Sequence, residues 1–485
     1  MRAIGLAIVA LALFAPQASA ATIEIDEIFC GCDPSSGDVD TKTLIVTAAP
    51  GELNRISVQE ESDDIVVEDL GAPLTGSCEE ASPGRRICRD RFTDIVVRLG
   101  DGDDELNLSD LGGSVDGGPG DDDIVVAGPP SQLLGGLGAD LLDARLAPGS
   151  GISYRDHTAG VTVRLNGLAD DGSVGEGDNV LGSLGSVEGG SGDDTLESGA
   201  DAASLAGGAG NDTLVGSPEG ESLLGQDGDD DIAAGGGNDS VDGGQGADVL
   251  SGPGHDEVSY AAAGRPLRLS IGDGPGDGAA GENDDILADI EDLIGGRRAD
   301  VMTGSAGANR LVGLGGADRM FAGEGEDMLE GGNDGDRMDA GPGPDRVTAG
   351  ARDLPLLNDG ERDRTDCRSS APVIEADSLD TFKSCAPWVS MRPLGRPRPG
   401  LPVRIALRCP RSSAVPCRGH IFVRMTPGNR RLSRTVRFGP IRPGRRAVLT
   451  VRLSRALDRS RLIRVIGVSA RRGVGRSTTR FFGGF

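Results

Sequence analysis

A nine-residue repeat occupies the middle of the chain and restricts the folds that the chain can adopt. The repeat follows the pattern GGxGxDxUx, where U is an apolar residue, and clear copies begin at Gly117, Gly135, Gly189, Gly207 and Gly243. A later block, Gly295 to Thr348, runs through six units without interruption. Such a period predicts one small structural unit stacked many times over. It accounts for most of the 79 glycines among the 485 residues.

Each unit has the composition of a turn followed by a very short strand. Glycine at positions 1, 2 and 4 permits positive φ, so six residues can form a tight turn. The apolar residue at position 8 then points inward from the strand, and two units make one coil of 18 residues. In one block the position-8 residues are Leu196, Leu205, Leu214, Leu223, Ile232, Val241 and Leu250. Stacked, they form a narrow aliphatic core, which agrees with a chain that has one Trp, two Tyr and ten Phe.

Position 6 is an aspartate in nearly every strong unit. A carboxylate beside glycine-exposed carbonyls, repeated in every coil, offers the all-oxygen surroundings of a Ca²⁺ site, whereas Mg²⁺ requires a tighter octahedron and keeps its waters. Without a cation the stacked acids would repel one another, so we expect metal binding and folding to be coupled. The candidate ligands are Asp104, Asp122, Asp140, Asp194, Asp212, Asp230, Asp239, Asp248, Asp256, Asp300, Asn309, Asp318, Asp327, Asp336 and Asp345.

In these residues the chain resembles the repeats-in-toxin (RTX) family of secreted bacterial proteins, with haemolysin-type calcium-binding nonapeptides. The resemblance extends over roughly Leu99 to Ser259 and Gly295 to Thr348. It implies a parallel β-roll that binds several Ca²⁺ ions between successive turns, with the position-6 aspartates and turn carbonyls as ligands. It implies little about biological role, because the family includes toxins, proteases, lipases and non-enzymatic surface proteins.

The repeats are unequal, and the inequality predicts where the cations bind. Strong units alternate with weak ones in two stretches, and the sixth residues of the weak units are Gly113, Ser131, Ala203 and Glu221. Alternate nonapeptides lie on opposite sides of a roll. We therefore expect Ca²⁺ on one side only in these stretches, and on both sides after Ala234 and again after Gly295.

Two 38-residue inserts, Ser153 to Gly190 and Ser259 to Gly296, interrupt the repeat. They are related by a constant offset of 106 residues, and the only two tyrosines, Tyr154 and Tyr260, occupy matching places. The acids that the inserts share are Asp171 and Asp277, Glu176 and Glu282, and Asp178 and Asp284. We expect a short strand and an acidic loop in each. An additional Ca²⁺ site in the loop and a solvated β excursion both stay open.

The N-terminus has the layout of a secretory signal peptide. Arg2 precedes the apolar run Ala3 to Ala15, which leads to Pro16 and the small residues of Ala18-Ser19-Ala20. The run is shorter than the ~20 residues of a membrane anchor. We expect cleavage of residues 1–20 after Ala20 and a secreted, extracellular protein, with association with the cell surface as an open alternative.

The eight cysteines all follow this segment, and an even number in an exported protein favours disulfides. Nearest-neighbour spacing pairs Cys78 with Cys88, Cys367 with Cys385 and Cys409 with Cys417, leaving Cys30 and Cys32. For this last pair a strained bridge, a bridge to a partner and a zinc site are alternatives, although no second Cys or His pair with metal-ligand spacing accompanies it.

The segments that flank the repeats predict further β-structure. Residues 21–98 contain alternating and β-branched runs, which we expect to form an N-terminal β cap, because an open roll needs covered ends. The roll itself is expected over residues 99–350. Residues 351–388, where the pattern decays, are expected to form the other cap and a linker, fastened by Cys367 and Cys385.

Charge marks a domain boundary near Val389. Residues 389–485 contain 24 Arg, no Lys and one acid, Asp458, whereas the whole chain has a net charge of −29. Alternating apolar and Arg residues between Pro-Gly turns predict an antiparallel β-sandwich-like domain with an Arg-rich face. This face suits an anionic cell-wall polymer, a membrane surface or DNA; the alternative is a solvated face partly neutralised by the roll. Without a binding motif or aromatic platform, specific nucleic-acid binding is not expected.

Taken together, these features predict an all-β chain, with a parallel β-roll between a small N-terminal cap and a C-terminal sandwich-like domain. We expect a secreted, non-enzymatic protein whose roll folds on binding Ca²⁺. The alternatives are an RTX-type enzyme or toxin and an adhesin that binds envelope polymers through its Arg-rich domain. Against an enzyme, His157, His255 and His420 are scattered, and H-E-x-x-H and G-x-S-x-G motifs are missing. The sequence indicates no oligomeric state.

Overall fold

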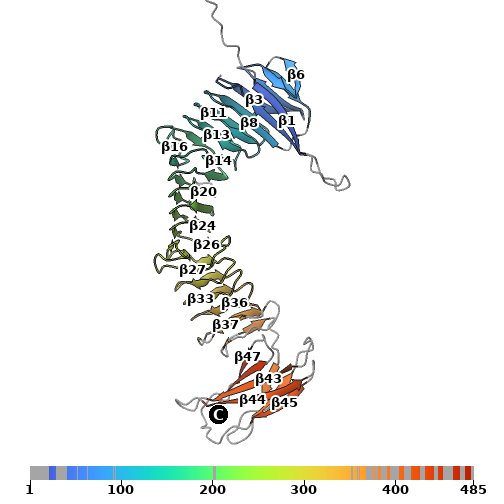
Figure 1. Ribbon diagram of the computed structural model, residues 1–485, viewed down its shortest axis with the longest axis vertical. Coiled ribbons are helices and arrows are strands. Elements are labelled where there is room, and N and C mark those ends of the chain that lie inside the picture. The colour runs from blue at the N-terminus through green and yellow to red at the C-terminus, as the bar shows by residue number, and fades with distance from the viewer. Residues whose placement is uncertain are drawn as a thin grey trace, which may run out of the picture. The chain divides into compact units, whose positions relative to one another are not determined.

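The computed structural model describes residues 21–28 and 41–367, apart from positions 52, 63, 71, 83, 91, 93, 200–203, 351–352, 358 and 360, and beyond them only the backbone of strands. The chain divides into two compact units, Met1–Ser217 and Pro218–Phe485 (Figure 1). The described residues form strands and turns and include no helix that could cross a membrane. The all-β prediction is therefore confirmed. The predicted signal peptide, Cys30 and Cys32 lie outside the described residues.

The first unit begins with eight strands, which make up the region predicted as the N-terminal cap. They are β1 (Ala21–Ile28), β2 (Thr41–Thr47), β3 (Arg55–Glu61), β4 (Asp64–Asp69), β5 (Leu74–Gly76), β6 (Glu79–Ser82), β7 (Arg85–Cys88) and β8 (Asp94–Arg98). β1 pairs antiparallel with β2, and β4 pairs antiparallel with both β3 and β7. β2 instead runs parallel to β8. The cap thus already contains parallel pairing and continues directly into the roll.

The rest of the first unit consists of short strands that recur at equivalent places in successive coils. They are β9 (Glu105–Ser109), β10 (Ser114–Asp116), β11 (Asp123–Ala127), β12 (Gln132–Leu134), β13 (Leu141–Leu146), β14 (Gly151–Ser153), β15 (Val161–Val163), β16 (Gly172–Ser173), β17 (Asn179–Leu181), β18 (Ser186–Glu188), β19 (Thr195–Glu197), β20 (Ser204–Ala209) and β21 (Thr213–Val215). Strands β8, β10, β12, β14, β18 and β20 pair in parallel on one side. Strands β3, β9, β11, β13 and β17 do so on the other.

The parallel register brings the position-8 residues together. Ile124 lies opposite Leu106 in the coil before and Leu142 in the coil after, and all three are fully buried. The core is therefore a stack of single aliphatic side chains, as the repeat predicts. Glycine at position 2 is required because the turns also stack closely: Gly136 has a φ of +102°, and a Cβ there would collide with the carbonyl oxygen of Gly118.

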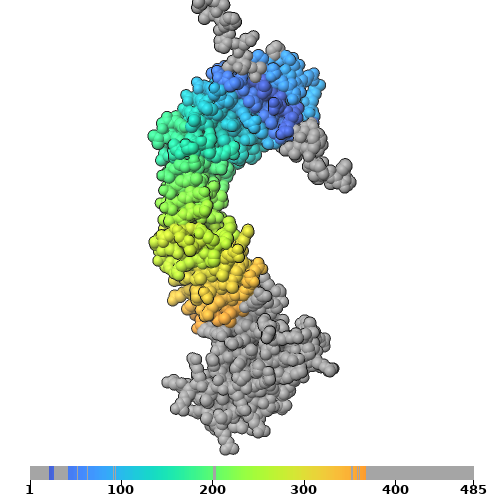
Figure 2. Space-filling view, in the orientation of Figure 1, coloured from blue at the N-terminus to red at the C-terminus, as the bar shows by residue number. Residues whose placement is uncertain are grey.

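The second unit contains the same architecture. On one side lie β22 (Ser222–Asp227), β24 (Ser240–Gln245), β26 (Glu257–Ser259), β30 (Asp292–Ile294), β32 (Arg310–Val312), β34 (Met328–Glu330), β36 (Arg346–Ala349), β38 (Arg364–Cys367) and β40 (Thr381–Lys383). On the other lie β23 (Asp231–Ala233), β25 (Val249–Ser251), β27 (Leu267–Ser270), β28 (Gly278–Ala279), β29 (Asp285–Ile286), β31 (Val301–Thr303), β33 (Arg319–Phe321), β35 (Arg337–Asp339), β37 (Leu354–Leu357) and β39 (Glu375–Ala376). Figure 2 shows that coils following one another in sequence also follow one another along the surface of this unit.

The parallel pairing continues past residue 350, where the fading pattern predicts the end of the roll. β36 pairs in parallel with β38 and β38 with β40, while β35 pairs with β37 and β37 with β39. The physical reason is that the unit starting at residue 358, NDGERDRTD, retains Asp363 at position 6 and places the fully buried Thr365 at position 8. A hydroxyl-bearing residue thus occupies the place of the usual aliphatic one.

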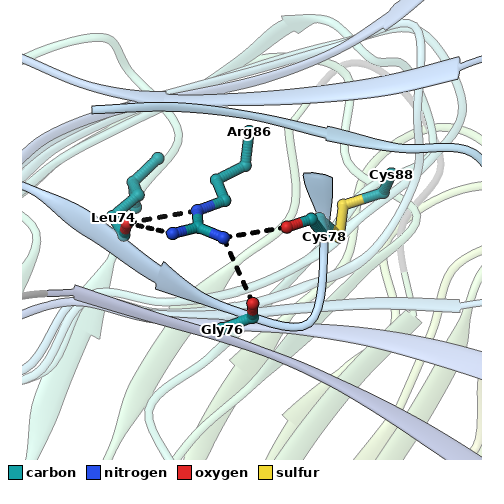
Figure 3. Close-up of a disulfide and its surroundings, with 5 residues drawn as sticks. All are labelled: Leu74, Gly76, Cys78, Arg86 and Cys88. Atoms are coloured by element: carbon teal, nitrogen blue, oxygen red, sulfur yellow. Dashed lines mark hydrogen bonds between the residues drawn. A yellow bond between two sulfur atoms is a disulfide. The ribbon is translucent and has the colours of Figure 1, made fainter. Parts of the chain in front are cut away.

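A disulfide joins Cys78 to Cys88, the pair that the sequence spacing predicts, with Cα atoms 4.8 Å apart. Between them Arg86 donates hydrogen bonds to the carbonyl oxygens of Leu74, Gly76 and Cys78, at 2.9 to 3.2 Å (Figure 3). The guanidinium therefore satisfies three backbone acceptors beside β5, next to a covalent cross-link. The predicted partners Cys367, Cys385, Cys409 and Cys417 have side chains outside the described residues.

The C-terminal region contains two antiparallel sheets. One consists of β41 (Ser390–Pro393), β42 (Val403–Arg408) and β45 (Arg446–Val451), and the other of β43 (Cys417–Met425), β44 (Leu432–Ile441), β46 (Ile463–Ser469) and β47 (Arg476–Phe481). These strands coincide with the runs of alternating apolar and Arg residues. The predicted Arg-rich face depends on side chains that lie outside the described part of the chain.

Candidate calcium sites

All fifteen predicted ligands occupy equivalent places in the roll. Each lies at the end of a turn, immediately before a strand, and each is 3% exposed or less. Fourteen carboxylates and one amide are thus buried in a protein whose core is otherwise aliphatic. Burial of so many acids requires compensation for each carboxylate oxygen.

One oxygen of the carboxylate is used for stacking. The backbone N–H of Asp104 donates to Asp122 Oδ1 at 2.8 Å, and that of Asp122 donates to Asp140 Oδ1 at 2.8 Å. In the second unit the N–H of Asp318 donates to Asp336 Oδ1 at 3.0 Å. The side chain at position 6 therefore binds the backbone of position 6 in the preceding coil. We call this series of bonds the aspartate ladder.

The other oxygen, Oδ2, is buried and accepts no hydrogen bond at ten of these residues. They are Asp104, Asp122, Asp140, Asp239, Asp248, Asp256, Asp318, Asp327, Asp336 and Asp345. A buried carboxylate oxygen without a partner is strongly unfavourable, and native structures rarely tolerate one. A cation bound beside this oxygen would compensate for its burial.

At Asp122 and Asp318 this open oxygen faces a backbone carbonyl across the glycine at position 1. A Cβ added to Gly117 would lie in contact with both Asp122 Oδ2 and the carbonyl oxygen of Gly135, one coil further on. At Gly313 the corresponding atoms are Asp318 Oδ2 and the carbonyl oxygen of Gly331. Glycine leaves this space open in both units, and oxygen atoms line it. A hard cation such as Ca²⁺ fits these donors.

Electrostatics lead to the same conclusion. Burial, reinforced by the neighbouring Asp104, Asp103 and Asp121, raises the pKa of Asp122 to about 7. For the same main reason the pKa of Asp336 is raised to about 7 and that of Asp345 to about 8. Ionised carboxylates are therefore costly in the stack, and a divalent cation between coils would offset both the desolvation and the repulsion.

At Asp194, Asp300 and Asn309 the turn is closed by a hydrogen bond of its own. Gly190 N–H donates to Asp194 Oδ2 at 2.6 Å, and Gly296 N–H donates to Asp300 Oδ2 at 2.8 Å. Ser305 N–H donates to Asn309 Oδ1 at 2.7 Å. Their oxygens would have to give up this bond to bind a cation, so these three residues are the weaker candidates. The sequence did not distinguish the two aspartates from the rest.

The two sides of the roll differ as the unequal repeats predict. In the first unit the weak side carries hydroxyls, since Gly113 N–H donates to Ser131 Oγ at 3.3 Å and Ser131 N–H donates to Ser150 Oγ at 3.0 Å. In the second unit Glu221 N–H donates to Asp239 Oδ1 at 2.8 Å, which begins a ladder on this side. Carboxylates then lie on both sides. Ala203 lies outside the described residues.

The inserts contribute two ladder residues that the sequence did not assign. Asp140 N–H donates to Asp178 Oδ1 at 2.9 Å, and Asp248 N–H donates to Asp284 Oδ1 at 3.2 Å. The Tyr154 hydroxyl donates to Asp178 Oδ2 at 3.1 Å and the Tyr260 hydroxyl to Asp284 Oδ2 at 2.6 Å. Both aspartates are fully buried. The sequence showed that the two inserts share a Tyr and an Asp at matching places. It did not show that the two side chains are in contact.

Three further residues extend the ladder at its ends. Asn54 N–H and its Nδ2 both donate to Asp104 Oδ1, at 2.6 and 2.9 Å. Asp353 and Asp363 accept from the N–H groups of Asp336 and Asp345 at 3.2 and 3.0 Å. Asn54 is the sixth residue of APGELNRIS, a weak copy of the repeat inside the predicted cap. Asp353 was hidden by a one-residue shortening, since it follows Asp336 by 17 positions rather than 18.

Fold and site together define a parallel β-roll with a repeated, oxygen-lined metal-site geometry. The family model of the RTX calcium-binding nonapeptide repeat matches the chain in four copies, at residues 188–219, 224–252, 294–329 and 330–351. These segments of the chain are thus RTX-type calcium-binding repeats. These matches begin at residue 188, whereas the aspartate ladder is already present from Asp104. No curated protein gave a match to the chain.

Proposed function

We propose that this chain is a secreted, non-enzymatic calcium-binding protein whose β-roll folds when Ca²⁺ binds between its coils. The observation that supports this most directly is the buried Oδ2 that accepts no hydrogen bond at ten position-6 aspartates and that faces a backbone carbonyl at Asp122 and Asp318. Bound Ca²⁺ would supply the positive charge that these oxygens require. The family of the repeats agrees with this ion.

The ten open aspartates are the principal ligands in this proposal, and Asp212 and Asp230 occupy the same position in their units. The ladder bond to Oδ1 orients each carboxylate before the ion arrives, and glycine at position 1 keeps the carbonyl accessible at Gly117 and Gly313. The closed turns at Asp194, Asp300 and Asn309 make these sites weaker or later to fill.

A non-enzymatic role is supported by the surroundings of the histidines that are described. His157 is buried between Asp156 and Glu176, with nitrogen-to-oxygen distances of 3.1 and 3.2 Å, and packs edge-on against Tyr154. No Ser or Cys nucleophile is bonded to its ring. These contacts fit a structural histidine in the first insert. An RTX-type enzyme or toxin is the alternative.

We propose export because the N-terminal segment has the layout of a signal peptide. The calcium-dependent folding proposed for the roll agrees with export. Extracellular calcium modules bind in the ~0.1 to 1 mM range, so a protein of this kind would be unfolded before export and folded afterwards. Cleavage after Ala20 remains part of the proposal.

The decisive experiment is a calcium titration of the mature protein, starting from the chelated state. We expect the circular dichroism of the chelated protein to lack most β-structure, and to gain it as Ca²⁺ reaches ~0.1 to 1 mM. The same concentration of Mg²⁺ serves as the control and should have little effect. A spectrum that does not respond to Ca²⁺ would contradict the proposal.

A second candidate function, adhesion to an anionic surface, is favoured by the 24 Arg and single acid of residues 389–485. Calcium-loaded protein should then sediment with anionic vesicles or cell-wall polymer at low salt and be released at high salt. Neutral vesicles are the control. Equal retention on neutral and anionic vesicles would leave the Arg-rich face as a solvated surface.

A further inference from the structure

We propose that Asp345, Asp359 and Asp363 form a three-carboxylate Ca²⁺ site near the C-terminal end of the roll. The inference rests on the proposed function and deepens it, because it identifies a site richer in charge than the repeats provide. It includes two aspartates, Asp359 and Asp363, that lie beyond the last segment matched by the repeat family.

The three side chains converge although Asp345 lies one coil before the unit that contains Asp359 and Asp363. One carboxylate oxygen of each lies within 4.8 Å of the corresponding oxygen of the other two. Among the residues that the structure describes, this is the one group of three acidic, His or Cys side chains close enough to share a metal ion. Elsewhere in the described roll, no three carboxylates have oxygens that all lie within 4.8 Å of one another.

Asp345 provides an independent reason to place a cation here. Its side chain is 1% exposed, and its Oδ2 accepts no hydrogen bond. This buried oxygen belongs to one of the three converging carboxylates. Asp363 is also fully buried, whereas Asp359 is exposed, so the group extends from the interior to the solvent. An ion could therefore enter from the Asp359 side.

Backbone hydrogen bonds hold the three carboxylates in position. Asp345 N–H donates to Asp363 Oδ1 at 3.0 Å, which continues the aspartate ladder from β36 to β38. Gly343 N–H donates to Asp359 Oδ2 at 3.3 Å, and Glu361 N–H donates to Asp359 Oδ1 at 2.9 Å. The third carboxylate is thus bound to the Asp345 turn itself.

The third carboxylate comes from a departure from the repeat. In NDGERDRTD, which starts at residue 358, Asp359 occupies position 2, where strong units have glycine; one coil earlier this position is Gly341. A substitution that weakens the match to the repeat therefore adds a charge to the site. Three carboxylates without nitrogen or sulfur donors favour Ca²⁺ over zinc, and the added charge predicts tighter binding than in the other coils.

The test is the Asp359→Asn variant of the full mature chain. The amide keeps an oxygen that can accept from Gly343, so the turn is preserved while one negative charge is lost. We expect one Ca²⁺ site to weaken by about 10-fold or more, measured by calorimetric titration, and one fewer ion at limiting Ca²⁺ in native mass spectrometry. Asp363→Asn should weaken the same site.

The matched control is Glu324→Gln, which removes one exposed acidic charge from a turn of the same unit, outside the three-carboxylate group. If Asp359→Asn binds Ca²⁺ with the same affinities and ion count as Glu324→Gln, the three-carboxylate site is overturned while calcium-dependent folding of the wild-type chain still stands. If the wild-type chain binds no Ca²⁺, the proposed function fails, and this site fails with it.

Discussion

At the scale of the residue, the two oxygens of a position-6 aspartate have different tasks. In Asp318, Oδ1 accepts the backbone N–H of Asp300 in the preceding coil, and Oδ2 faces the carbonyl of Gly331 across Gly313. Asn309 shows what an amide does in the same place: its Oδ1 closes its own turn, and its Nδ2 donates to the carbonyl oxygen of Glu291 at 2.9 Å. An uncharged amide can therefore close this turn.

Substitutions at Asp318 should separate the two tasks. Asp318→Asn keeps an oxygen for Asp300 N–H, whereas Asp318→Ala leaves that N–H without its 2.9 Å bond. Both variants should bind fewer Ca²⁺ ions in calorimetry. Only the alanine variant should lose a further ~1–3 kcal/mol, the cost of an unsatisfied buried group, in urea unfolding at saturating Ca²⁺. Equal stability of the two variants would show that the ladder bond contributes nothing.

At the scale of the element, each insert replaces a turn of the roll by a longer path that ends in the same hydrogen bond. Asp178 follows Asp140 by 38 residues and Asp284 follows Asp248 by 36, yet both receive the ladder N–H. In both inserts a tyrosine hydroxyl occupies the second oxygen. In the insert coils a neutral hydroxyl thus donates to the oxygen that accepts no hydrogen bond at ten of the repeat aspartates.

Removal of the phenol should expose this difference. Tyr260→Phe leaves the packing of the ring but deprives Asp284 Oδ2 of its 2.6 Å bond. We expect a loss of ~1–3 kcal/mol in urea unfolding at saturating Ca²⁺. Tyr154→Phe is the internal replicate, because Asp178 has the same arrangement. Unchanged stability in both variants would contradict a structural role for the tyrosines.

At the scale of the whole molecule, many buried carboxylates act together on the pH dependence. Burial raises the pKa of Asp140, Asp248 and Asp336 to about 7 and of Asp345 to about 8, from the usual 3.8. A carboxyl with a raised pKa in the folded state stabilises that state below pH ~4, and this stabilisation is lost as the pH rises through 7 to 8. We therefore expect the metal-free roll to be least stable above pH 7 to 8, where these carboxyls are ionised.

The chelated protein should therefore gain β-structure as the pH is lowered from 8 to 5, monitored by circular dichroism. With Ca²⁺ present the direction reverses, because protons compete for the same oxygens, and the Ca²⁺ concentration at the folding midpoint should rise as the pH falls from 8 to 6. Chelated protein that is equally folded at pH 5 and pH 8 would show that the ladder acids do not limit the metal-free fold.

Much of this arrangement could be predicted from the sequence, because the turn and the strand of each unit depend on only nine consecutive residues. Position 6 and position 8 lie where the nonapeptide predicts, and Ser131 in a weak unit correctly indicates a side without carboxylates. Residues whose spacing breaks the period were missed, namely Asp178 and Asp284 behind the inserts and Asp353 after a shortened unit. The extent of the roll was underestimated for the same reason, since the unit that starts at residue 358 retains Asp363 but lacks glycine at positions 1, 2 and 4.

The sequence by itself determined the turn, the strand and the identity of the buried side chains, because glycine spacing and the apolar period act within nine residues. Only the tertiary structure decided which oxygens stay open. Asp122 and Asp194 are indistinguishable as sixth residues of strong units, yet Asp194 Oδ2 accepts Gly190 N–H at 2.6 Å, whereas Asp122 Oδ2 accepts nothing. The physical reason is that the partner of an oxygen depends on its surroundings in the stacked coils, and residues up to 50 positions apart, such as Asn54 and Asp104, meet there.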